Sequence, residues 1–365
     1  MSVKKPTALV AITKHGTELA KRLKAAMPEA ELLVSEKFAS AAPGATVMKE
    51  TVSKEIQRWF HDYEEICFVI SLGAVVRMIA PVLKDKHSDP GVVCVDDRGQ
   101  FAISVLSGHV GGANAFCEKV AKALGAQAVV TTASDVGKTL PVDILGRELG
   151  WTPEGEENVT RVSASVVNEE PVAFVQECGE KTWWTRDVPL PKSITVLSSL
   201  EGVDLSAFKS FLVVTDRLRE RLPDVIQDRL VLYRPKSIVL GLGCDRGVPE
   251  AAMFEAVETT LKEAGLSLRC VRNVATIDIK GNEPAILSLC ERRNWPLVTF
   301  TRDELNETFA KVAVPNPSAV VKKYTGTPGV SEPSALRSTG AKTLLQEKRK
   351  FPPGITVAVA RVVFP

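Results

Sequence analysis

The chain lacks most of the motifs that point directly to a known chemistry. Its four histidines form no cluster at metal-ligand spacing, and its seven cysteines include no C-x-x-C pair, so neither a zinc site nor a disulfide framework is expected. It has no G-x-x-x-x-G-K-[ST] phosphate loop, no G-x-S-x-G nucleophile elbow and no H-E-x-x-H metalloprotease helix. A net charge of +2 over 365 residues argues against the strongly basic surface of a nucleic-acid-binding protein.

Long apolar runs are also missing. No stretch reaches the roughly 18 apolar residues that a membrane-spanning helix needs, and the N-terminus lacks the apolar segment and cleavage site of a signal peptide. Most cysteines lie in apolar runs, as Cys67 does in residues 66–70, where a free thiol packs as a small hydrophobic group. We therefore expect a cytoplasmic protein in a reducing compartment, with no membrane and no nucleic acid among its partners.

Short buried strands alternate with amphipathic helices along most of the chain, and 365 residues are too many for one compact core. We predict a multidomain α/β fold with open, mostly parallel sheets and flanking helices. The predicted domains are an N-terminal α/β domain (1–137), a small central α/β domain (138–235) and a C-terminal α/β domain (236–365). A helix is expected from residue 142 to 149. A linker is expected at 233–236, where Pro235 disfavours helix in the residue before it.

The stretch 103–116 reads as a strand, a glycine loop and a helix. The loop contains three glycines and three polar side chains, namely Gly108, Gly111, Gly112, Ser107, His109 and Asn114. The glycines permit positive φ and a close approach of a ligand to the backbone. The N–H groups at the helix start are expected to be unpaired and to face a carboxylate or phosphate. Any α/β protein needs glycines at such a turn, so a purely structural interpretation stays open.

Residues 71–77 form a second strand–turn–helix pattern, which we expect at the same sheet edge as the first, with Gly73 in the turn. Arg77 could clamp a carboxylate bidentately or pair with Asp85 or Asp89. The charged loop that begins at Lys84 is either solvated or part of a binding site. Residues 131–135, which end in Asp135, either cap a helix or add polar groups to the same site.

The C-terminal third contains a comparable set of weaker signals. Gly241-x-Gly243 after a predicted strand suggests a phosphate or carboxylate loop, although Gly247 falls one place beyond the third glycine of a dinucleotide fingerprint. Residues 275–283 place Lys280 beside acidic groups at a strand end, and residues 326–332 form a glycine loop before a helix, with Glu332 in it. Together these stretches predict a second cleft that favours anions.

Taken in order, these stretches resemble the cobalt-precorrin-5A hydrolases (the CbiG family) of anaerobic cobalamin biosynthesis. The resemblance to the N-terminal domain of that family lies in residues 71–77, 80–81, 84–86, 89–90, 106–114 and 131–135. Residues 241–244, 275–283 and 329–332 resemble its C-terminal domain, which also occurs alone in the aerobic pathway. Ser331 and Ser334 stand where alanines are commoner in the family.

The resemblance implies a hydrolase that opens the δ-lactone between the ring A acetate and C20 of a cobalt-containing corrin precursor. C20 and its methyl group leave as acetaldehyde, and the product is cobalt-precorrin-5B. The substrate carries many carboxylates and brings its own cobalt, so we expect no cofactor and no protein metal site. The residues expected to bind it are Gly73, Arg77, Lys84, Gly108, Gly111, Gly112, Gly243, Lys280 and Glu332.

For the chemistry we expect His109 to act as general base or acid, with Ser107 and Asn114 orienting water or the lactone carbonyl. Asp135 is expected to hold His109, and the N–H groups at 111–113 are expected to stabilise an oxyanion. The competing hypothesis is a non-catalytic tetrapyrrole-binding or hand-over protein, in which His109 ligates the substrate's cobalt or is structural. A nucleotide-binding protein fits less well because the phosphate motifs are incomplete. A homodimer and transient contact with neighbouring pathway methyltransferases are left open.

Overall fold

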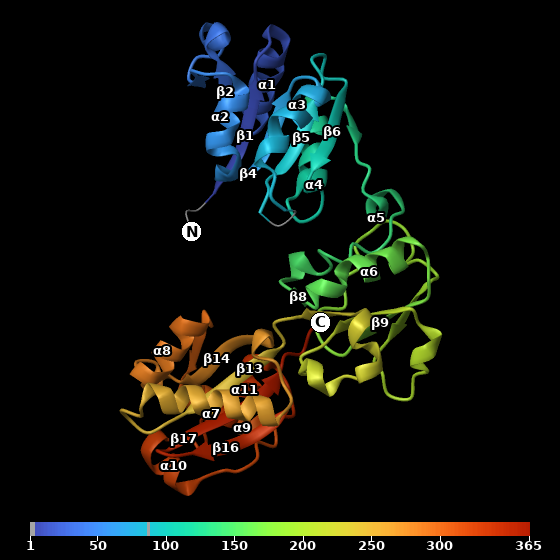
Figure 1. Ribbon diagram of the computed structural model, residues 1–365. Coiled ribbons are helices and arrows are strands. Elements are labelled where there is room, and N and C mark those ends of the chain that lie inside the picture. Colours follow the sequence, from blue (N-terminus) through green and yellow to red (C-terminus); the bar gives the residue numbers. More distant parts are fainter. Residues whose placement is uncertain (1–3, 86–87) are drawn as a thin grey trace. The chain divides into compact units, whose positions relative to one another are not determined.

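The computed structural model describes residues 4–85 and 88–365, so Lys86 and His87 of the predicted charged loop lie outside the described residues. The chain divides into two compact units, Met1–Ile144 and Leu145–Pro365 (Figure 1). The first unit contains one sheet and the second contains two, each mostly parallel and flanked by helices. The predicted multidomain α/β class is therefore confirmed, while the proposed domain boundaries stay a prediction.

The sheet of the first unit has the order β3-β2-β1-β4-β5-β6-β7. Its strands are β1 (Lys5–Ala11), β2 (Glu31–Ser35), β3 (Thr46–Met48), β4 (Tyr63–Val69), β5 (Gly91–Val95), β6 (Phe101–Leu106) and β7 (Gln127–Val129). All neighbours pair in parallel except β5 and β6, which form an antiparallel hairpin. Residues Ala8 to Ala11 of β1 are fully buried because both faces of the sheet are covered.

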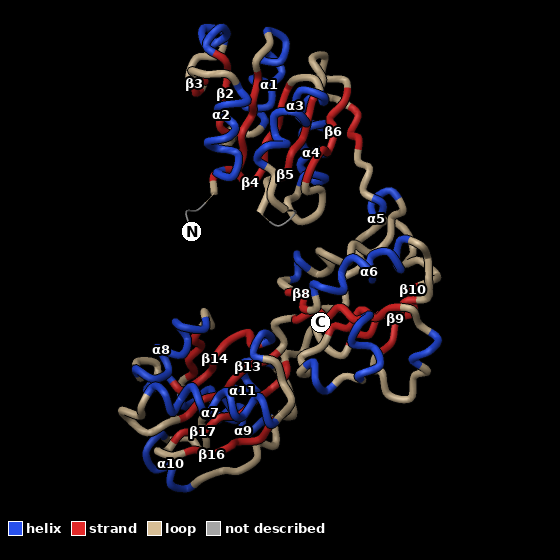
Figure 2. Tube along the Cα trace, viewed as in Figure 1, coloured by secondary structure: helices blue, strands red, loops and turns tan. Residues whose placement is uncertain are grey.

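Helices cover the two faces of this sheet in pairs (Figure 2). One face packs against α1 (Lys14–Ala26) and α4 (Ala113–Leu124). The other packs against α2 (Val52–Trp59) and α3 (Leu72–Ile79). Met48 ends β3, and α2 begins only after Thr51. The unit ends with the short α5 (Ala133–Val136), and the 3-10 turns are η1 (Glu36–Ala41), η2 (Phe60–Asp62) and η3 (Ala80–Val82).

The reversal of chain direction at the β5–β6 hairpin decides where the glycine loops lie. Because β4 and β5 are parallel and β6 runs against them, the carboxyl end of β6 lies at the opposite sheet edge from the carboxyl end of β4. The expectation that residues 71–77 and 103–116 turn at one edge is therefore wrong. The loop after β6 instead lies beside the start of β5, where a Cβ on Gly91 would overlap the carbonyl oxygen of Gly111. Since β7 is parallel to β6, the segment after β7 reaches this same edge.

The first sheet of the second unit has the order β10-β9-β11-β12-β8, with only β8 antiparallel. Its strands are β8 (Thr152–Glu154), β9 (Val172–Gln176), β10 (Ile194–Leu197), β11 (Ser210–Val214) and β12 (Leu230–Arg234). Helix α6 (Glu156–Val167) packs on β11 and β12. The 3-10 turns are η4 (Arg147–Leu149), η5 (Leu205–Ala207), η6 (Arg219–Arg221) and η7 (Asp224–Arg229).

Two predictions for this region are wrong. The helix expected at 142–149 is only the η4 turn, because Gly146 and Gly150 on either side of it adopt φ of +72° and +76°. The predicted linker also begins too early, since Tyr233 and Arg234 end β12 and are buried.

The second sheet of this unit has the order β15-β14-β13-β17-β16. Its strands are β13 (Ile238–Gly243), β14 (Val271–Ile277), β15 (Leu297–Phe300), β16 (Gln346–Phe351) and β17 (Ile355–Arg361). One face packs against α7 (Glu250–Glu263) and α8 (Pro284–Arg293). The helices that follow are α9 (Arg302–Lys311), α10 (Ala319–Thr325) and α11 (Ser331–Thr339). The 3-10 turns η8 (Leu268–Cys270) and η9 (Asp278–Lys280) lie directly before and directly after β14.

Helix α11 lies unusually close to β13. A Cβ on Gly241 would overlap the carbonyl oxygen of Ser331, so only glycine lets the helix backbone lie directly on the strand. Gly241 and Gly243 are thus strand residues under α11, and the predicted phosphate or carboxylate loop at this place is wrong.

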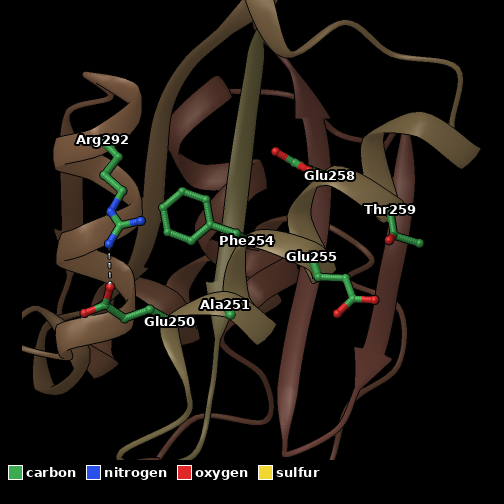
Figure 3. Close-up of a pocket in the computed structure, with 7 residues that line it drawn as sticks. All are labelled: Glu250, Ala251, Phe254, Glu255, Glu258, Thr259 and Arg292. Atoms are coloured by element: carbon green, nitrogen blue, oxygen red, sulfur yellow. Dashed lines mark hydrogen bonds and ion pairs between the residues drawn. The ribbon is translucent and has the colours of Figure 1, made fainter.

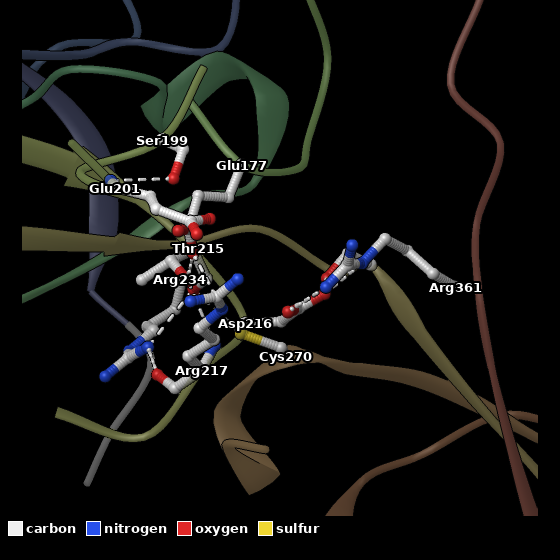
Figure 4. Close-up of polar contacts among 10 residues, drawn as sticks. Glu177, Ser199, Glu201, Thr215, Asp216, Arg217, Arg234, Cys270 and Arg361 are labelled. Atoms are coloured by element: carbon white, nitrogen blue, oxygen red, sulfur yellow. Dashed lines mark hydrogen bonds and ion pairs between the residues drawn. The ribbon is translucent and has the colours of Figure 1, made fainter. Parts of the chain in front are cut away.

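The two sheets of the second unit are joined by a polar contact at the carboxyl ends of β11 and β12 (Figure 4). The carboxylate of Asp216, which is fully buried, accepts from Arg361 Nε at 2.8 Å and Nη2 at 2.7 Å, and from Ser237 Oγ at 3.1 Å. The backbone adds bonds from Leu218 N to Gly265 O and from Ser267 N to Asp216 O. Here the carboxyl edge of a parallel sheet, a common place for ligands, is occupied by the neighbouring sheet's residues.

Candidate functional site

The loop from Ser107 to Gly112 connects β6 to α4 in a tight turn, which requires two residues with positive φ and two glycines that leave room for neighbouring groups. Ser107 adopts φ of +54°, which is uncommon for a residue with a side chain, and Gly112 adopts +80°. A Cβ on Gly108 would meet the amide of Asn114 at 2.6 Å, and one on Gly111 would overlap the side chain of Ser107. These two glycines therefore make room for neighbouring protein groups.

The N–H groups at the start of α4 are already used by the loop. Gly112 N donates to His109 O at 3.1 Å, Ala113 N to Ser107 O at 3.2 Å, and Asn114 N to Gly108 O at 3.0 Å. The expectation of unpaired N–H groups is wrong at Gly112, Ala113 and Asn114, so of the oxyanion site expected at 111–113 only the N–H group of Gly111 stays a prediction. The physical reason is that the turn closes on itself, so its carbonyls satisfy the orphan donors that a helix start usually leaves.

The side chain of His109 lies between two carboxylates. Its Nδ1 is 2.9 Å from Asp143 Oδ1 and its Nε2 is 3.1 Å from Asp135 Oδ2. The hydroxyl of Ser134 lies 3.1 Å from the same Nε2. A neutral imidazole carries one N–H, whereas the imidazolium carries two, so only the protonated ring can donate to both acids at once.

Asn114 extends this arrangement toward the strand. Its Nδ2 donates to Asp135 Oδ2 at 2.7 Å and to Thr132 Oγ1 at 2.9 Å, and its Oδ1 accepts from Ser104 Oγ at 2.7 Å. Three predicted residues, His109, Asn114 and Asp135, thus come together at the carboxyl ends of β6 and β7. The residues of α5, which were expected either to cap a helix or to add to the site, contribute Ser134 and Asp135 to the site.

The hydrogen bond to Asp143 raises the pKa of His109 above its usual value, with partial burial opposing this and the charges of both acids adding to it. The His109 side chain is 11% exposed, against 28% for Asp135 and 21% for Asp143. A molecule that enters from solvent therefore meets the carboxylates more readily than the ring. The arrangement is suited to acid–base chemistry in which the imidazolium supplies the charge and a carboxylate meets the substrate.

Sequence reasoning missed Asp143, although a signal was present. It is the only acid between Asp135 and Glu148 and stands among the apolar residues of 140–145. A lone acid in an apolar segment is expected to be partly buried and therefore to need a partner.

Ser107 differs from its neighbours. Its Oγ is buried and makes no hydrogen bond within the part of the chain that the structure describes. A buried hydroxyl without a partner is uncommon, and one in a strained conformation beside His109 is typical of functional sites.

The predicted cationic clamps of the first unit lie on the surface. Arg77 is exposed and donates to Gly73 O at 3.3 Å within α3. Among residues 4–85 and 88–365 it forms no ion pair, and Asp89 instead accepts from the backbone N of Lys84 at 3.0 Å. Lys84 is exposed as well, in the loop that leads to the start of β5. By strand direction, that loop shares a sheet edge with the His109 loop, whereas Gly73 lies at the other edge.

The predicted residues of the C-terminal sheet have protein partners. Glu332 is buried and accepts from Asn316 Nδ2 at 2.9 Å and from Lys348 N at 3.0 Å. Lys280 lies 3.7 Å from the buried Glu283, which also accepts from Gly247 N at 2.7 Å. These contacts hold loops around β13 and β16 in place, and Gly243 lies within β13.

A surface pocket on α7 does not resemble a site for an anionic ligand (Figure 3). Its lining includes three glutamates, Glu250, Glu255 and Glu258, and its arginine, Arg292, lies over Phe254 and pairs with Glu250 at 3.2 Å. Within the described ranges, no group of three or more His, Cys, Asp or Glu side chains could hold a metal ion. No helix found there is long and apolar enough to cross a membrane.

Fold and site together define a multidomain α/β protein with a histidine–carboxylate unit suited to acid–base catalysis. Three family descriptions match consecutive parts of the chain: Cobalamin synthesis G N-terminal at residues 54–135, Cobalamin biosynthesis central region at 140–235 and Cobalamin synthesis G C-terminus at 238–360.

Curated relatives match the whole length. The cobalt-precorrin-5A hydrolase of Priestia megaterium is 43% identical, covering 98% of this chain and 95% of that protein. The cobalt-precorrin-5A hydrolase of Salmonella typhimurium is 31% identical, covering 97% of each. The chain belongs to the cobalt-precorrin-5A hydrolase family.

Proposed function

We propose that the protein is a cobalt-precorrin-5A hydrolase of cobalamin biosynthesis. It opens the ring A δ-lactone of the cobalt-corrin precursor and releases C20 as acetaldehyde, giving cobalt-precorrin-5B. The observation that carries the proposal is 43% identity to a cobalt-precorrin-5A hydrolase over nearly the full length of both chains. The histidine–carboxylate unit supplies chemistry that lactone hydrolysis needs, because water must lose a proton as it attacks and the leaving oxygen must gain one.

In this proposal His109 and Asp135 act as one acid–base pair. Asp135 is the more exposed partner and meets water or the lactone, while His109 holds the proton that the pair exchanges. Asn114 orients the Asp135 carboxylate through its 2.7 Å bond. The Ser107 hydroxyl donates to the lactone or to the attacking water, which would satisfy the buried oxygen.

Substrate carboxylates are proposed to meet exposed cations. Arg77 and Lys84 are the exposed candidates in the first unit. Lys280 of the second unit is largely covered, with 13% of its side chain exposed, and lies 3.7 Å from Glu283, so its role stays a prediction from the sequence. Arg77 is suited to bidentate contact because its guanidinium is exposed at the surface of α3. Gly73, Gly108, Gly111 and Gly112 are proposed to act by shaping the backbone of their loops. Gly243 and Glu332 are buried among protein groups, so they are not proposed to touch the substrate.

Cobalt enters with the substrate in this scheme, and the corrinoid is the partner that it requires. We further propose a cytoplasmic location. All seven cysteines are free and six are buried, which suits a reducing compartment.

The direct test is to incubate purified protein with cobalt-precorrin-5A and measure acetaldehyde. Release that depends on enzyme concentration is expected. Tight binding of the corrinoid without acetaldehyde would contradict the proposal and would identify a binding protein. In a second step, His109→Gln and Ser107→Ala are expected to lower kcat, whereas Arg77→Gln is expected to raise KM, because it removes binding that is equal in the ground and transition states.

A further inference from the structure

Asp143 lies outside every motif that the sequence suggested, yet its carboxylate makes the 2.9 Å contact to His109 Nδ1. It belongs to the irregular segment that follows α5 and precedes the 3-10 turn η4. The contact joins residues 34 positions apart. The two nitrogens of the His109 ring therefore contact two different segments: Asp135 of α5 at Nε2, and Asp143 of the segment after α5 at Nδ1.

We propose that Asp143 is a positioning residue for the hydrolysis, holding the His109 ring in one orientation and in its doubly protonated form so that Asp135 faces the substrate. The proposal rests on the proposed function, since it assigns a role within the same site.

Geometry supports this role. If His109 were neutral, the unprotonated ring nitrogen would direct its lone pair at one of the two carboxylates at about hydrogen-bond distance, and the lone pair and the carboxylate oxygen would repel each other. With the ring protonated, both contacts are charge-assisted hydrogen bonds. The two acids compete for the same imidazolium, so each limits how strongly the other can take its proton. Removing Asp143 takes away its contact at Nδ1, while the contacts of Asp135 and Ser134 at Nε2 stay.

The role differs from that of a purely structural ion pair. Loss of a purely structural ion pair would lower the stability of the fold but would not change the pH at which the His109–Asp135 pair gains or loses its proton. A positioning residue changes the pH at which the pair works, because the Asp143 hydrogen bond is the largest cause that raises the pKa of His109.

The experiment compares Asp143→Asn with wild type by two independent measurements. The first is proton NMR titration of the imidazole C–H signals, which is tractable because the chain has four histidines and His109→Gln identifies the signal of interest. In Asp143→Asn the His109 signal is expected to titrate at lower pH, while the other three histidines stay unchanged and so report an intact fold.

The second measurement is the pH dependence of acetaldehyde release. In Asp143→Asn, kcat is expected to fall roughly ten- to a hundredfold, the range that follows from losing one charge-assisted hydrogen bond, with little change in KM. The alkaline limb of the kcat profile is expected to move to lower pH together with the NMR titration. Asp143→Glu, which keeps the negative charge, is expected to restore part of kcat and part of the wild-type position of the alkaline limb.

Glu148→Gln is the matched control, since it removes one exposed acid five positions along the chain. It is expected to leave both measurements at wild-type values. An unchanged His109 titration in Asp143→Asn would overturn the inference, and so would an unchanged pH profile. Wild-type protein that releases no acetaldehyde would instead overturn the proposed function, and the NMR titration distinguishes that failure because it needs no substrate.

Discussion

The ion pair between Asp216 and Arg361, which joins the two sheets of the second unit, allows a quantitative prediction. Asp216→Asn keeps the size of the side chain and removes its charge. The wild-type carboxylate is fully buried and accepts two bonds from Arg361 (Figure 4). It accepts a third from Ser237. The variant amide oxygen can replace only one of the two carboxylate oxygens, and its NH2 group then faces a donor at the other position, so the change removes charge assistance at a site that keeps its shape.

The expected cost follows from burial on the two sides of the pair. Removing one partner of a fully buried pair costs about 3–5 kcal/mol, mostly because the other charge is left without compensation. The Arg361 side chain is 34% exposed, so water can solvate it when its partner is lost. A loss of one charge-assisted bond costs about 1.5–3 kcal/mol. We therefore expect Asp216→Asn to lower the free energy of unfolding of the second unit by about 2 kcal/mol, in the range set by these values.

Urea unfolding followed by tryptophan fluorescence measures this change, because Trp151 and Trp295 are buried in the two sheet regions that the joint connects. The control is Asp228→Asn, which breaks the exposed pair with Arg161 and is expected to cost less than about 1 kcal/mol. Equal midpoints for the two variants would refute the reasoning, since they would mean that burial gives the Asp216 pair no special weight.

Three further predictions concern packing, protonation and a helix cap. Gly241→Ala is expected to destabilise the protein by about 1–3 kcal/mol in thermal unfolding, because α11 must move away from β13. The control is Gly73→Ala in α3, where the new Cβ would meet only the Arg77 side chain at 3.5 Å, and it is expected to be neutral or stabilising by up to about 1 kcal/mol. Equal effects of the two substitutions would contradict the close packing of α11 on β13. The stability difference between wild type and His109→Gln is expected to be full below a pH of about 6.5, the unfolded-state pKa of histidine. It is expected to disappear as the pH rises through the raised folded-state pKa of His109. A difference that is independent of pH in urea unfolding would contradict stabilisation by the contacts of protonated His109 with Asp135 and Asp143. Thr301→Ala removes the capping box that Thr301 forms with Glu304 at the start of α9 and is expected to cost about 1 kcal/mol by the same denaturation assay, and no measurable loss would show that the cap adds nothing.

Much of the fold could be predicted because its elements are local. The strand, glycine loop and helix expected at 103–116 are present as β6, the loop from Ser107 to Gly112 and α4. The central region could not be predicted as well. Residues 142–149 have the apolar spacing of a helix, but Gly146 and Gly150 take positive φ there, and the Trp151 ring occupies the space that a Cβ on Gly146 would need.

The site was predicted in part, and the missing part is nonlocal. His109, Asn114 and Asp135 follow two strand ends, and adjacent parallel strands bring such ends together. The direction of β6 relative to β4 depends on the pairing of a whole hairpin, so the sequence pattern did not reveal which loops share an edge. Glycines were misread for a related reason. Gly108 and Gly241 have the same appearance in a sequence as ligand-binding glycines, and only the contacts of their missing Cβ atoms show that protein atoms occupy the space.

The place of Asp143 in the chain has a consequence for dissecting the molecule. A chain cut at residue 137, where sequence patterns put the first domain boundary, would keep the sheet, His109 and Asp135 but would lose the second acid. Its histidine would then titrate like that of Asp143→Asn, and its weak activity could be mistaken for proof that the other domains are needed for catalysis. A chain cut after Ile144, where the first compact unit ends, keeps both acids. Comparing the two fragments by histidine titration would separate the contribution of seven residues from that of the whole second unit.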